Sequence, residues 1–216
     1  MGSGEPKRRY DDACGTAHAL ELIGDRWTLL VLRELMFGPR RFSELRGDLP
    51  GISANVLTQR LAELEERGLA ARKRLPPPAS VQVYEATPWG LEAEPIVQSL
   101  GRWAARSPGH DPTLPLSAVS LMLSFGTMFD AARAKKFDGR IGFRLGPESF
   151  LARIRKGRFK VARGEAGEGD VLFTASPTAI AAVVYGGASL DSVQVEGDRG
   201  LAEKFVRLFP LPPKVA

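Results

Sequence analysis

A segment dense in proline and glycine divides the chain into two parts of different character. Residues 107–115 read SPGHDPTLP, directly after one long helical pattern and directly before another. Such punctuation is typical of a linker between domains, because proline and glycine favour turns and extended chain over helix. We therefore predict one domain over residues 10–106, a linker over residues 107–115 and a second domain over residues 116–212.

The composition is that of an ordinary globular protein. Of the 216 residues, 44% are hydrophobic and 25% are charged, and the formal net charge is +5. No apolar run approaches the roughly 20 residues that span a bilayer, and the opening MGSGEPKRRYDD is polar throughout, so we expect neither a transmembrane helix nor a secretory signal. The expectation is a cytoplasmic protein without membrane insertion.

Residue types that carry catalysis or hold metals are scarce. Cys14 is the single cysteine, which excludes an internal disulfide, and with only His18 and His110 besides it the chain cannot assemble a Cys/His zinc site. The sequence has no P-loop and no G-x-S-x-G motif, and the glycine-rich stretch at residues 164–169 has the wrong spacing. We therefore predict a protein that is not an enzyme and has no metal or cofactor. An oxidative link between two chains through Cys14 remains open.

The first domain reads as mostly helical. A short helix over residues 16–23 is followed by a second over residues 26–37, which is apolar on nearly every face. A third short helix around Phe42 and Leu45 leads into a turn at residues 47–51. The second helix is therefore expected to be the buried scaffold of the domain.

The helix after this turn combines a buried stripe with a face of short amides. Ser53 is a good N-cap. The buried stripe consists of leucines at helical spacing: Leu57, Leu61 and Leu64. At about 100° per residue, Asn55 and Gln59 then point outward. A helix that enters the DNA major groove needs compact donors near its N-terminal end, where Asn and Gln pair with adenine and Arg with guanine. Asn55, Gln59 and Arg60 meet that requirement.

A basic hairpin follows this helix. Residues 69–75 and 81–85 read as strands around a proline-rich turn. The first strand carries three consecutive cations: Arg72, Lys73 and Arg74. Such a wing would hold phosphates or probe the minor groove, which supplies affinity and register more than sequence choice. A solvated helix surface and an ordinary exposed strand edge are the structural alternatives for the amide face and the basic run.

A long helix closes the first domain. It runs from a cap at Thr87 through Trp103, and Pro95 inside it should kink it. Ile96, Leu100 and Trp103 form its apolar stripe. Because such a stripe leading away from the core would be wasted on a monomer, we predict a homodimer held by the first and last helices of this domain.

Cys14 and several runs of sequence together carry a specific family resemblance. The runs are LELIGDRW (20–27), REL (33–35), PRRFSEL (39–45), PGIS (50–53), LTQRLAEL (57–64), GL (68–69) and YEATPWG (84–90). Over residues 10–106 the chain thus resembles the HxlR-type winged helix-turn-helix regulators of bacteria.

The resemblance implies a homodimer that binds a near-palindromic DNA operator. Residues 53–60 would occupy the major groove, with residues 72–80 alongside as the wing. The implied DNA-contacting residues are Arg41, Ser53, Asn55, Val56, Thr58, Gln59, Arg60, Arg72, Lys73, Arg74 and Ser80. Some family members respond to electrophiles or oxidants through a cysteine near the N-terminus, which makes Cys14 a candidate redox residue; an inert thiol is the alternative.

The second domain mixes helices with closely spaced strands. Its predicted helices cover residues 116–137, 177–185 and 199–209, and its predicted strands cover residues 141–145, 149–155, 158–163, 171–175 and 192–196. Lys156 and Gly157 form the two-residue turn of a hairpin. This order is typical of an α+β fold.

In the register of that hairpin, one face is apolar and the other is strongly basic. The basic face carries Arg153, Arg155, Arg158 and Lys160, and residues 111–216 hold a net charge of +4 out of the whole-chain +5. Such a face attracts an anionic ligand head group, a phosphate backbone or a membrane surface, with a merely solvated sheet face as the alternative.

Further runs carry a second resemblance. Arg163 and Gly164, VLFTA at residues 171–175, the Gly186 turn and VQVEGD at residues 193–198 resemble the sterol-carrier-protein type of lipid-binding domain. The resemblance covers most of residues 116–210 and implies an antiparallel sheet covered by helices around an apolar tunnel. The candidate lining residues are Leu121, Phe125, Met128, Phe129, Phe143, Phe173, Val184 and Phe205. Plain core is the alternative for each of them.

The combined prediction is an α+β protein in which a winged helix-turn-helix domain is followed by a sterol-carrier-like domain. We expect a dimeric transcription regulator that binds duplex DNA and is modulated by a hydrophobic small-molecule effector in the second domain. The alternative is a lipid-binding or transfer protein that uses the winged helix mainly for dimerisation. A hydrolase acting in the apolar cavity is disfavoured, because the sequence offers no set of nucleophile, base and orienting residue.

Overall fold

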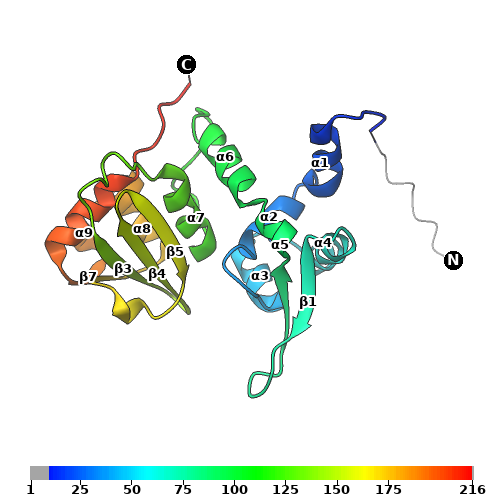
Figure 1. Cartoon of the computed structure of the whole chain (residues 1–216), viewed down its shortest axis with the longest axis horizontal. Coiled ribbons are helices and arrows are strands. Elements are labelled where there is room, and N and C mark those ends of the chain that lie inside the picture. Colours follow the sequence, from blue (N-terminus) through cyan, green and yellow to red (C-terminus); the bar gives the residue numbers. More distant parts are fainter. Residues whose placement is uncertain (1–9, 216) are drawn as a thin grey trace. The chain divides into compact units, whose positions relative to one another are not determined.

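The computed structural model describes residues 10–215, and the chain divides into two compact units between Glu92 and Ala93 (Figure 1). The division lies ahead of the linker expected at residues 107–115, because the helix that precedes this segment packs on the helix that follows it. The limits of the two functional domains stay a prediction. Among residues 10–215, none of the helices combines the length and the apolar character that a membrane crossing requires.

The first unit is a helical domain with one hairpin. Its elements are α1 (Gly15–Ile23), α2 (Thr28–Glu34), α3 (Phe42–Asp48), α4 (Ala54–Glu66), β1 (Ala70–Arg74), β2 (Gln82–Ala86) and α5 (Pro88–Leu91). The core is centred on α2, whose Val31 and Leu32 are fully buried, as expected of the scaffold helix. Helix α2 is shorter than the predicted residues 26–37, because a turn replaces its last residues.

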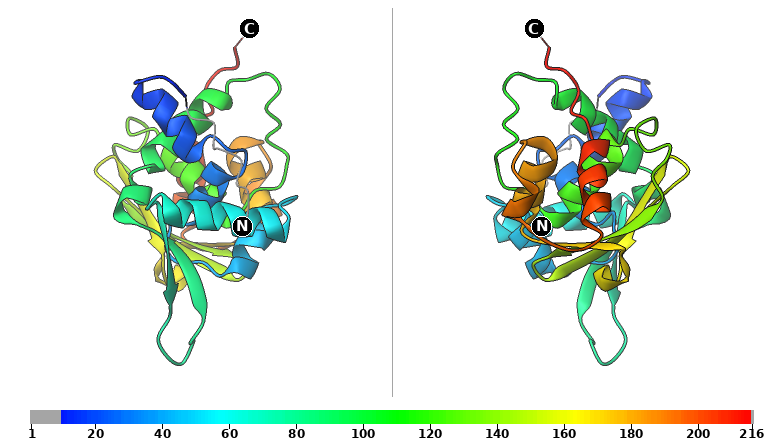
Figure 2. Two further views of the ribbon diagram at one scale, coloured as in Figure 1. Left: turned by 90° about the vertical axis from the view of Figure 1, so that its right-hand side faces the viewer. Right: turned by 90° about the vertical axis from the view of Figure 1, so that its left-hand side faces the viewer.

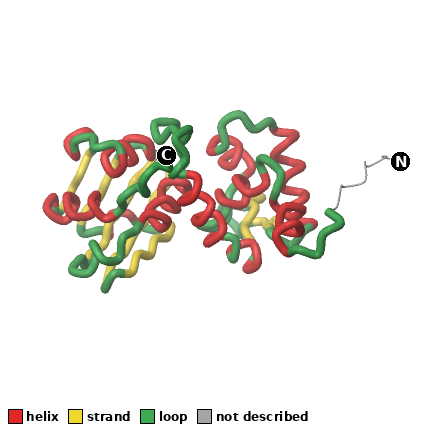
Figure 3. The backbone as a smooth tube through the Cα atoms, turned by 90° about the horizontal axis from the view of Figure 1, so that it is seen from above, coloured by secondary structure: helices red, strands yellow, loops and turns green. Residues whose placement is uncertain are grey.

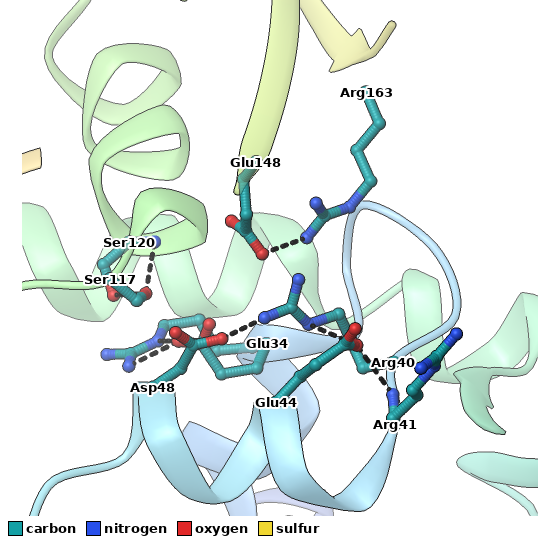
Figure 4. Close-up of polar contacts among 10 residues, drawn as sticks. Glu34, Arg40, Arg41, Glu44, Asp48, Ser117, Ser120, Glu148 and Arg163 are labelled. Atoms are coloured by element: carbon teal, nitrogen blue, oxygen red, sulfur yellow. Dashed lines mark hydrogen bonds and ion pairs between the residues drawn. The ribbon is translucent and has the colours of Figure 1, made fainter. Parts of the chain in front are cut away.

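The hairpin is tied to the helices by Arg40. β1 and β2 pair antiparallel, and the backbone of Arg40 exchanges two 2.8 Å hydrogen bonds with the backbone of Tyr84 on β2. The side chain of Arg40 is buried and pairs with Asp48 and Glu44 of α3 (Figure 4). The base of the wing is therefore joined to α3 by both backbone and side chain.

The predicted helix from Thr87 to Trp103 is wrong as a single element. The chain forms α5, breaks at Glu92 and Ala93, and continues as α6 (Glu94–Ala104) in the second unit. Pro95 therefore lies in the first turn of a helix, where its missing N–H has no intrahelical partner to lose, and it produces no kink. Thr87 does cap α5, since its hydroxyl accepts a 3.0 Å hydrogen bond from Gly90 N–H.

The second unit is an α+β domain. After α6 come α7 (Ala118–Met128), β3 (Gly139–Leu145), β4 (Glu148–Arg155), β5 (Arg158–Arg163), η1 (Ala166–Glu168), β6 (Val171–Thr174), α8 (Pro177–Tyr185), η2 (Leu190–Ser192), β7 (Gln194–Gly197), α9 (Arg199–Phe205) and η3 (Val206–Leu208). Helix α7 ends nine residues before the predicted position 137, because Phe129 leaves helical geometry with φ −58° and ψ 128°.

The strands of this unit form one sheet, drawn in yellow in Figure 3, with the order β5-β4-β3-β6-β7. It is mixed rather than antiparallel throughout, since β3 and β6 pair in parallel. The reason is the connection from β5 to β6, which crosses the sheet through η1 and returns beside β3. Gly142 of β3 accommodates this crossing, because a Cβ atom there would collide with the carbonyl oxygen of Ala166.

Helices α7, α8 and α9 cover one face of the sheet (Figure 2). Between helices and sheet lies a cluster of aromatic rings: Phe125 of α7 contacts Phe143 of β3 at 5.7 Å between ring centroids and Phe205 of α9 at 5.6 Å. Phe143 stacks on Phe173 of β6 at 5.6 Å. We call this face of the sheet the inner face, and the face turned away from the three helices the outer face.

Candidate nucleic-acid interface

Helix α4 has the two sides that the sequence predicts. The hydroxyl oxygen of Ser53 accepts a 3.2 Å hydrogen bond from the Val56 N–H, so Ser53 is the N-cap. The stripe of Leu57, Leu61 and Leu64 is buried in the core of the first unit. Asn55 and Gln59 are exposed on the opposite side. The helix therefore presents amide side chains to solvent at its N-terminal end, where unpaired backbone N–H groups and the helix dipole also favour an anion.

Polar contacts on this exposed side are local to the helix. The Thr58 hydroxyl donates a 2.9 Å hydrogen bond to the Ala54 carbonyl, and the Gln59 amide donates one of 3.2 Å to Glu63. Both side chains stay at the solvent-exposed surface. A DNA base that binds Gln59 therefore has to replace a single long hydrogen bond.

Arg60 lies apart from the other predicted contact residues. Its side chain is only 12% exposed, and its guanidinium pairs with Asp25 in the α1–α2 turn and, at 3.1 Å, with Glu63. The physical reason is the position of Asp25, which meets α4 on the flank that Arg60 occupies. The expectation that Arg60 reads a base is therefore corrected: Arg60 ties α4 to the preceding helices.

Arg67 reinforces this connection. It donates a 2.7 Å hydrogen bond to the Leu22 carbonyl at the end of α1 and lies 3.5 Å from Glu63. Sequence reasoning missed Arg67, because its partner belongs to a different helix that is distant along the chain. The α4 helix is thus held by charged contacts on one flank and by leucines beneath.

The wing carries its cations on both faces of the β1–β2 hairpin. Arg72 pairs with Glu65 at 2.9 Å, and its guanidinium lies 5.4 Å from the centroid of the Tyr84 ring. The hydrogen bond that Arg72 donates to Glu65 raises the pKa of Arg72 above its ordinary value. Lys73 pairs with Glu85, and Arg74 is exposed toward the tip.

The predicted DNA-contacting residues divide by exposure. Arg41, Ser53, Asn55, Thr58, Gln59, Arg72, Lys73, Arg74 and Ser80 are exposed, whereas Val56 and Arg60 are partly buried. Arg41 caps α3, where its backbone N–H donates a 2.8 Å hydrogen bond to Glu44. Ser80 stands in the wing turn with a positive φ of 43°. The first unit thus offers an amide face and a cationic hairpin as neighbours along the chain.

Cys14 has the two properties that a reactive thiol needs, exposure and a lowered pKa. It is exposed at the N-cap position of α1. Hydrogen bonds from the backbone and the side chain of Thr16, followed by one from the backbone of Ala17, lower the pKa of the thiol below its ordinary value. The N-terminus of a helix stabilises a thiolate in this way.

Large apolar side chains are exposed on both helices that were expected to form a dimer interface. On α6 they are Ile96, Leu100 and Trp103, with Trp103 74% exposed. On α1 it is Leu20, which is 51% exposed. The spacing on α6 places the three residues on one side of that helix.

The candidate ligand-lining residues of the second unit form its aromatic and aliphatic core. Leu121, Phe125, Met128, Phe143, Phe173 and Phe205 are buried, and Phe129 and Val184 are partly buried. Phe209, which the sequence reasoning missed, contacts Phe125 at 4.7 Å and Phe205 at 4.9 Å. In this structure the rings contact one another.

One polar pair borders this core. The hydroxyl groups of Ser124 and Tyr185 lie 2.9 Å apart, and burial raises the pKa of Tyr185. The pair joins α7 to α8 beside the Phe125 ring.

Comparison with known proteins separates the two parts of the chain. Residues 22–111 match the HxlR-like helix-turn-helix family, and residues 128–210 match the SCP-2 sterol transfer family. The HTH-type transcriptional regulator YkvN of Bacillus subtilis is 42% identical over 94 residues, which are 42% of this chain and 77% of YkvN. The HTH-type transcriptional regulator YodB of the same species is 36% identical over 86 residues, which are 40% of this chain and 77% of YodB.

A solved structure of YodB, described as its reduced form, is 32% identical and covers 46% of this chain and 100% of that chain, with a TM-score of 0.41. The relatives are transcriptional regulators rather than enzymes, in agreement with the sequence prediction.

Proposed function

The chain belongs to the HxlR-like helix-turn-helix family of transcriptional regulators, and from this premise we propose that it binds duplex DNA with the exposed side of α4 in the major groove. The observation that supports the proposal most directly is the pair of exposed amides, Asn55 and Gln59, above a buried leucine stripe at a capped helix N-terminus. Amide side chains match the N6 and N7 groups that adenine presents in the major groove.

Base reading and phosphate binding fall to different residues in this proposal. Asn55 and Gln59 contact base edges, while Arg41 and the wing cations contact phosphates and set the position of the protein on the duplex. Arg72 and Lys73 already have carboxylate partners, so binding DNA exchanges those exposed ion pairs for phosphate contacts. Exposed ion pairs of this kind contribute little to stability and are easily exchanged.

The proposed assembly is a homodimer on a two-fold symmetric operator. The exposed apolar side chains of α1 and α6 form the contact between the two copies, and each copy places one α4 in a half-site. Half-sites one helical turn apart lie about 34 Å from each other, or at multiples of that distance.

The second unit is proposed to bind a hydrophobic effector, supported by the match of residues 128–210 to the SCP-2 sterol transfer family. Because the phenylalanine rings contact one another, a ligand entering between helices and sheet has to separate some of them. The effector shifts DNA binding only by favouring one arrangement of the chain over another, and a coupling of about 1–3 kcal/mol suffices.

The test of DNA recognition begins with selection of bound duplexes from a random-sequence pool. Gln59→Ala is expected to lose about 1–3 kcal/mol of discrimination at one position of each half-site, whereas Lys73→Ala weakens all sequences alike. Gln98→Ala, which removes a glutamine of α6 instead, serves as the matched control. Selection of no preferred sequence, together with a shallow dependence of affinity on salt, would favour a lipid-binding protein that uses the winged helix for dimerisation.

The effector proposal has a separate test. Native mass spectrometry of the full chain is expected to show a co-purifying apolar molecule, and readdition of that molecule to extracted protein is expected to change operator affinity by roughly 5–150-fold. If no apolar molecule co-purifies and extraction leaves the operator affinity unchanged, the effector proposal is wrong.

A further inference from the structure

The outer face of the second unit's sheet carries a concentrated group of positive charges. Six exposed cations project from three neighbouring strands: Arg140 and Arg144 of β3, Arg153 and Arg155 of β4, and Arg158 and Lys160 of β5. The η1 segment crosses this face over Gly142, so Arg144 stands on one side of the crossing and the other five cations stand on the other side. We call the six cations the cationic sheet face. They stand on the opposite side of the sheet from α7, α8 and α9. The ring contacts that α7 and α9 make with the sheet, such as Phe125 with Phe143 and Phe205 with Phe173, lie on the inner face.

The strand register brings these charges directly opposite one another. Arg140 of β3 lies directly opposite Arg153 of β4, and Arg153 lies directly opposite Lys160 of β5. Two residues further along β4, Arg155 lies directly opposite Arg158 of β5. Neighbouring strands are about 4.8 Å apart and alternate residues about 6.7 Å apart, so five cations fall within a small rectangle.

Few carboxylates offset these charges. Asp170 pairs with Arg140 at 3.1 Å and Asp138 with Arg155 at 3.5 Å. Within residues 10–215, no carboxylate lies within ion-pair distance of the other four cations. Hydrogen bonds from Arg140, together with the positive charges of Arg140 and Arg153, hold the pKa of Asp170 below its ordinary value. The crossing segment adds the exposed Glu165 and Glu168, so six cations stand against four carboxylates and the surface keeps a net positive charge.

This arrangement lowers the stability of the sheet, and a bound anion would offset the loss. Like charges directly opposite each other in a sheet are destabilising. The charges are also segregated along the sheet, since the outer face at the far edge carries Gln194 and Glu196 of β7. A polyanion that bridged the rows on β3, β4 and β5 would remove the repulsion within them.

The chemistry of the surface distinguishes among anions. A small anion is held by donors that converge in a concave site, whereas these donors are exposed on a sheet surface. Five of the six cations are arginines, which match phosphate oxygens with paired donors. An anionic membrane is bound more strongly when apolar side chains enter the lipid boundary. Here the positions next to the cations on the outer face are Gly142, which is buried beneath Ala166 of η1, the half-buried Leu151 and the small Ala162.

We propose that the cationic sheet face binds the phosphate backbone of duplex DNA, as a second DNA-contacting surface that is separate from α4 and the wing. Duplex DNA carries one negative charge per about 1.7 Å of its axis, so a rectangle of cations with edges of several ångströms meets several phosphates at once. The contact reads no sequence, because it reaches phosphates and not base edges.

The test is the salt dependence of full-chain binding to a long duplex without an operator. Each lost phosphate contact lowers the magnitude of the slope of log affinity against log salt by about 0.9. Arg153→Gln with Lys160→Gln is therefore expected to lower that slope by about 2 and to weaken binding to all sequences alike. Arg155→Gln with Arg158→Gln removes two other cations of the same rectangle and is expected to behave in the same way, which guards against a folding defect in either variant.

The matched control removes the same amount of charge from the helical side of the unit. Lys204→Gln with Arg207→Gln changes two exposed cations of α9 and η3, and the slope is expected to stay at the wild-type value. Slopes that are unchanged in both sheet variants, or lowered equally in the control, overturn the proposal.

Vesicles of phosphatidylcholine and phosphatidylserine distinguish the competing partner. If the sheet variants lose vesicle binding while their DNA slope stays at the wild-type value, the face binds membranes and the DNA proposal is wrong. Failure of the α4 proposal is recognised separately, because Asn55→Ala with Gln59→Ala changes operator preference and leaves the slope on non-operator DNA in place.

Discussion

Two arginines near the proposed DNA surface have opposite environments. Arg60 is enclosed by Asp25 and Glu63 and is 12% exposed, whereas Arg74 extends from the wing into solvent. A guanidinium that is enclosed by carboxylates stabilises the fold and is not free to move to a base edge. An exposed guanidinium adds little to stability and can bind phosphate.

This contrast predicts that the same substitution lowers the stability of the protein at Arg60 and leaves it nearly unchanged at Arg74. Arg60→Met is expected to lower the free energy of unfolding by about 1–3 kcal/mol, because it leaves the largely buried carboxylate of Glu63 and the exposed one of Asp25 without this partner. Arg74→Met is expected to change it by less than about 0.5 kcal/mol. Chemical denaturation measures both values. If Arg60→Met kept its stability but changed base preference, Arg60 would belong to the reading surface after all.

The environment of Cys14 predicts its reactivity toward alkylating reagents. Because hydrogen bonds at the start of α1 lower the pKa of the thiol, the thiolate fraction at neutral pH exceeds that of an ordinary cysteine. The increase of the alkylation rate with pH is therefore expected to have its midpoint at a lower pH than that of an ordinary cysteine. Mass spectrometry after timed exposure to iodoacetamide over a pH series gives the midpoint. Thr16→Val, which removes the side-chain hydrogen bond, is expected to move the midpoint to higher pH. A wild-type midpoint at or above that of free cysteine contradicts this account.

At the scale of elements, the exposed stripe of α6 is the clearest feature without a partner inside its own unit. Ile96, Leu100 and Trp103 follow helical spacing and remain exposed, although α6 packs its other side on α7. Burial of such side chains is worth about 1.5–3 kcal/mol each, which is enough to hold two copies together when several are buried at once.

The dimer proposal predicts that a charge on this stripe separates the copies. Trp103→Glu is expected to raise the dimer dissociation constant by more than about tenfold, because losing the burial of one large side chain exceeds about 1.4 kcal/mol. Ala182→Glu, at an exposed position of α8 outside the proposed interface, is the control. Sedimentation velocity over a concentration series measures the change. A wild-type protein that stays monomeric, or a Trp103→Glu variant that stays dimeric, contradicts the proposed interface.

Elements set by short-range chemistry could be predicted from the sequence. The Lys156–Gly157 turn joins β4 and β5 with positive φ at both residues, 52° and 68°, as a two-residue hairpin requires. The Ser53 cap and the leucine stripe of α4 follow from spacing within one turn or two. The early end of α7 could not be predicted, because Phe129 turns toward Phe159 and Phe209, which are distant in the sequence.

The same limit applied to the candidate site. The exposed amides of α4 could be predicted from the sequence, because helical spacing alone places them opposite buried leucines. Helical spacing alone does not place Arg60, because its side chain turns toward Asp25 in the α1–α2 turn. The roles of Arg40 and Arg67 also depend on partners in other elements, so the sequence carried no local signal for them.

At the scale of the whole molecule, the sequence shows how charge is distributed along the chain, but the order of strands decides which charges lie next to one another. The basic excess of the second half was visible in the sequence, but the alignment of Arg140 with Arg153 and Lys160 depends on the pairing of β3 with β4. The place of β6 beside β3 depends on the crossing through η1 and could not be deduced from alternation of apolar residues. Two surfaces of one chain are thus proposed to contact DNA: α4 with the wing contacts bases and phosphates, and the cationic sheet face contacts phosphates alone.

Operators that lack a major-groove acceptor test the central claim most directly. Replacing single adenines of the selected operator by 7-deazaadenine removes the N7 acceptor and leaves the base pair intact. For the wild-type chain, one such replacement in each half-site is expected to cost about 1–3 kcal/mol of binding free energy, and for Gln59→Ala or Asn55→Ala the same replacement is expected to cost nothing further. Equal losses in the wild type and in both variants, or no loss at any adenine of the operator, would contradict the placement of α4 in the major groove.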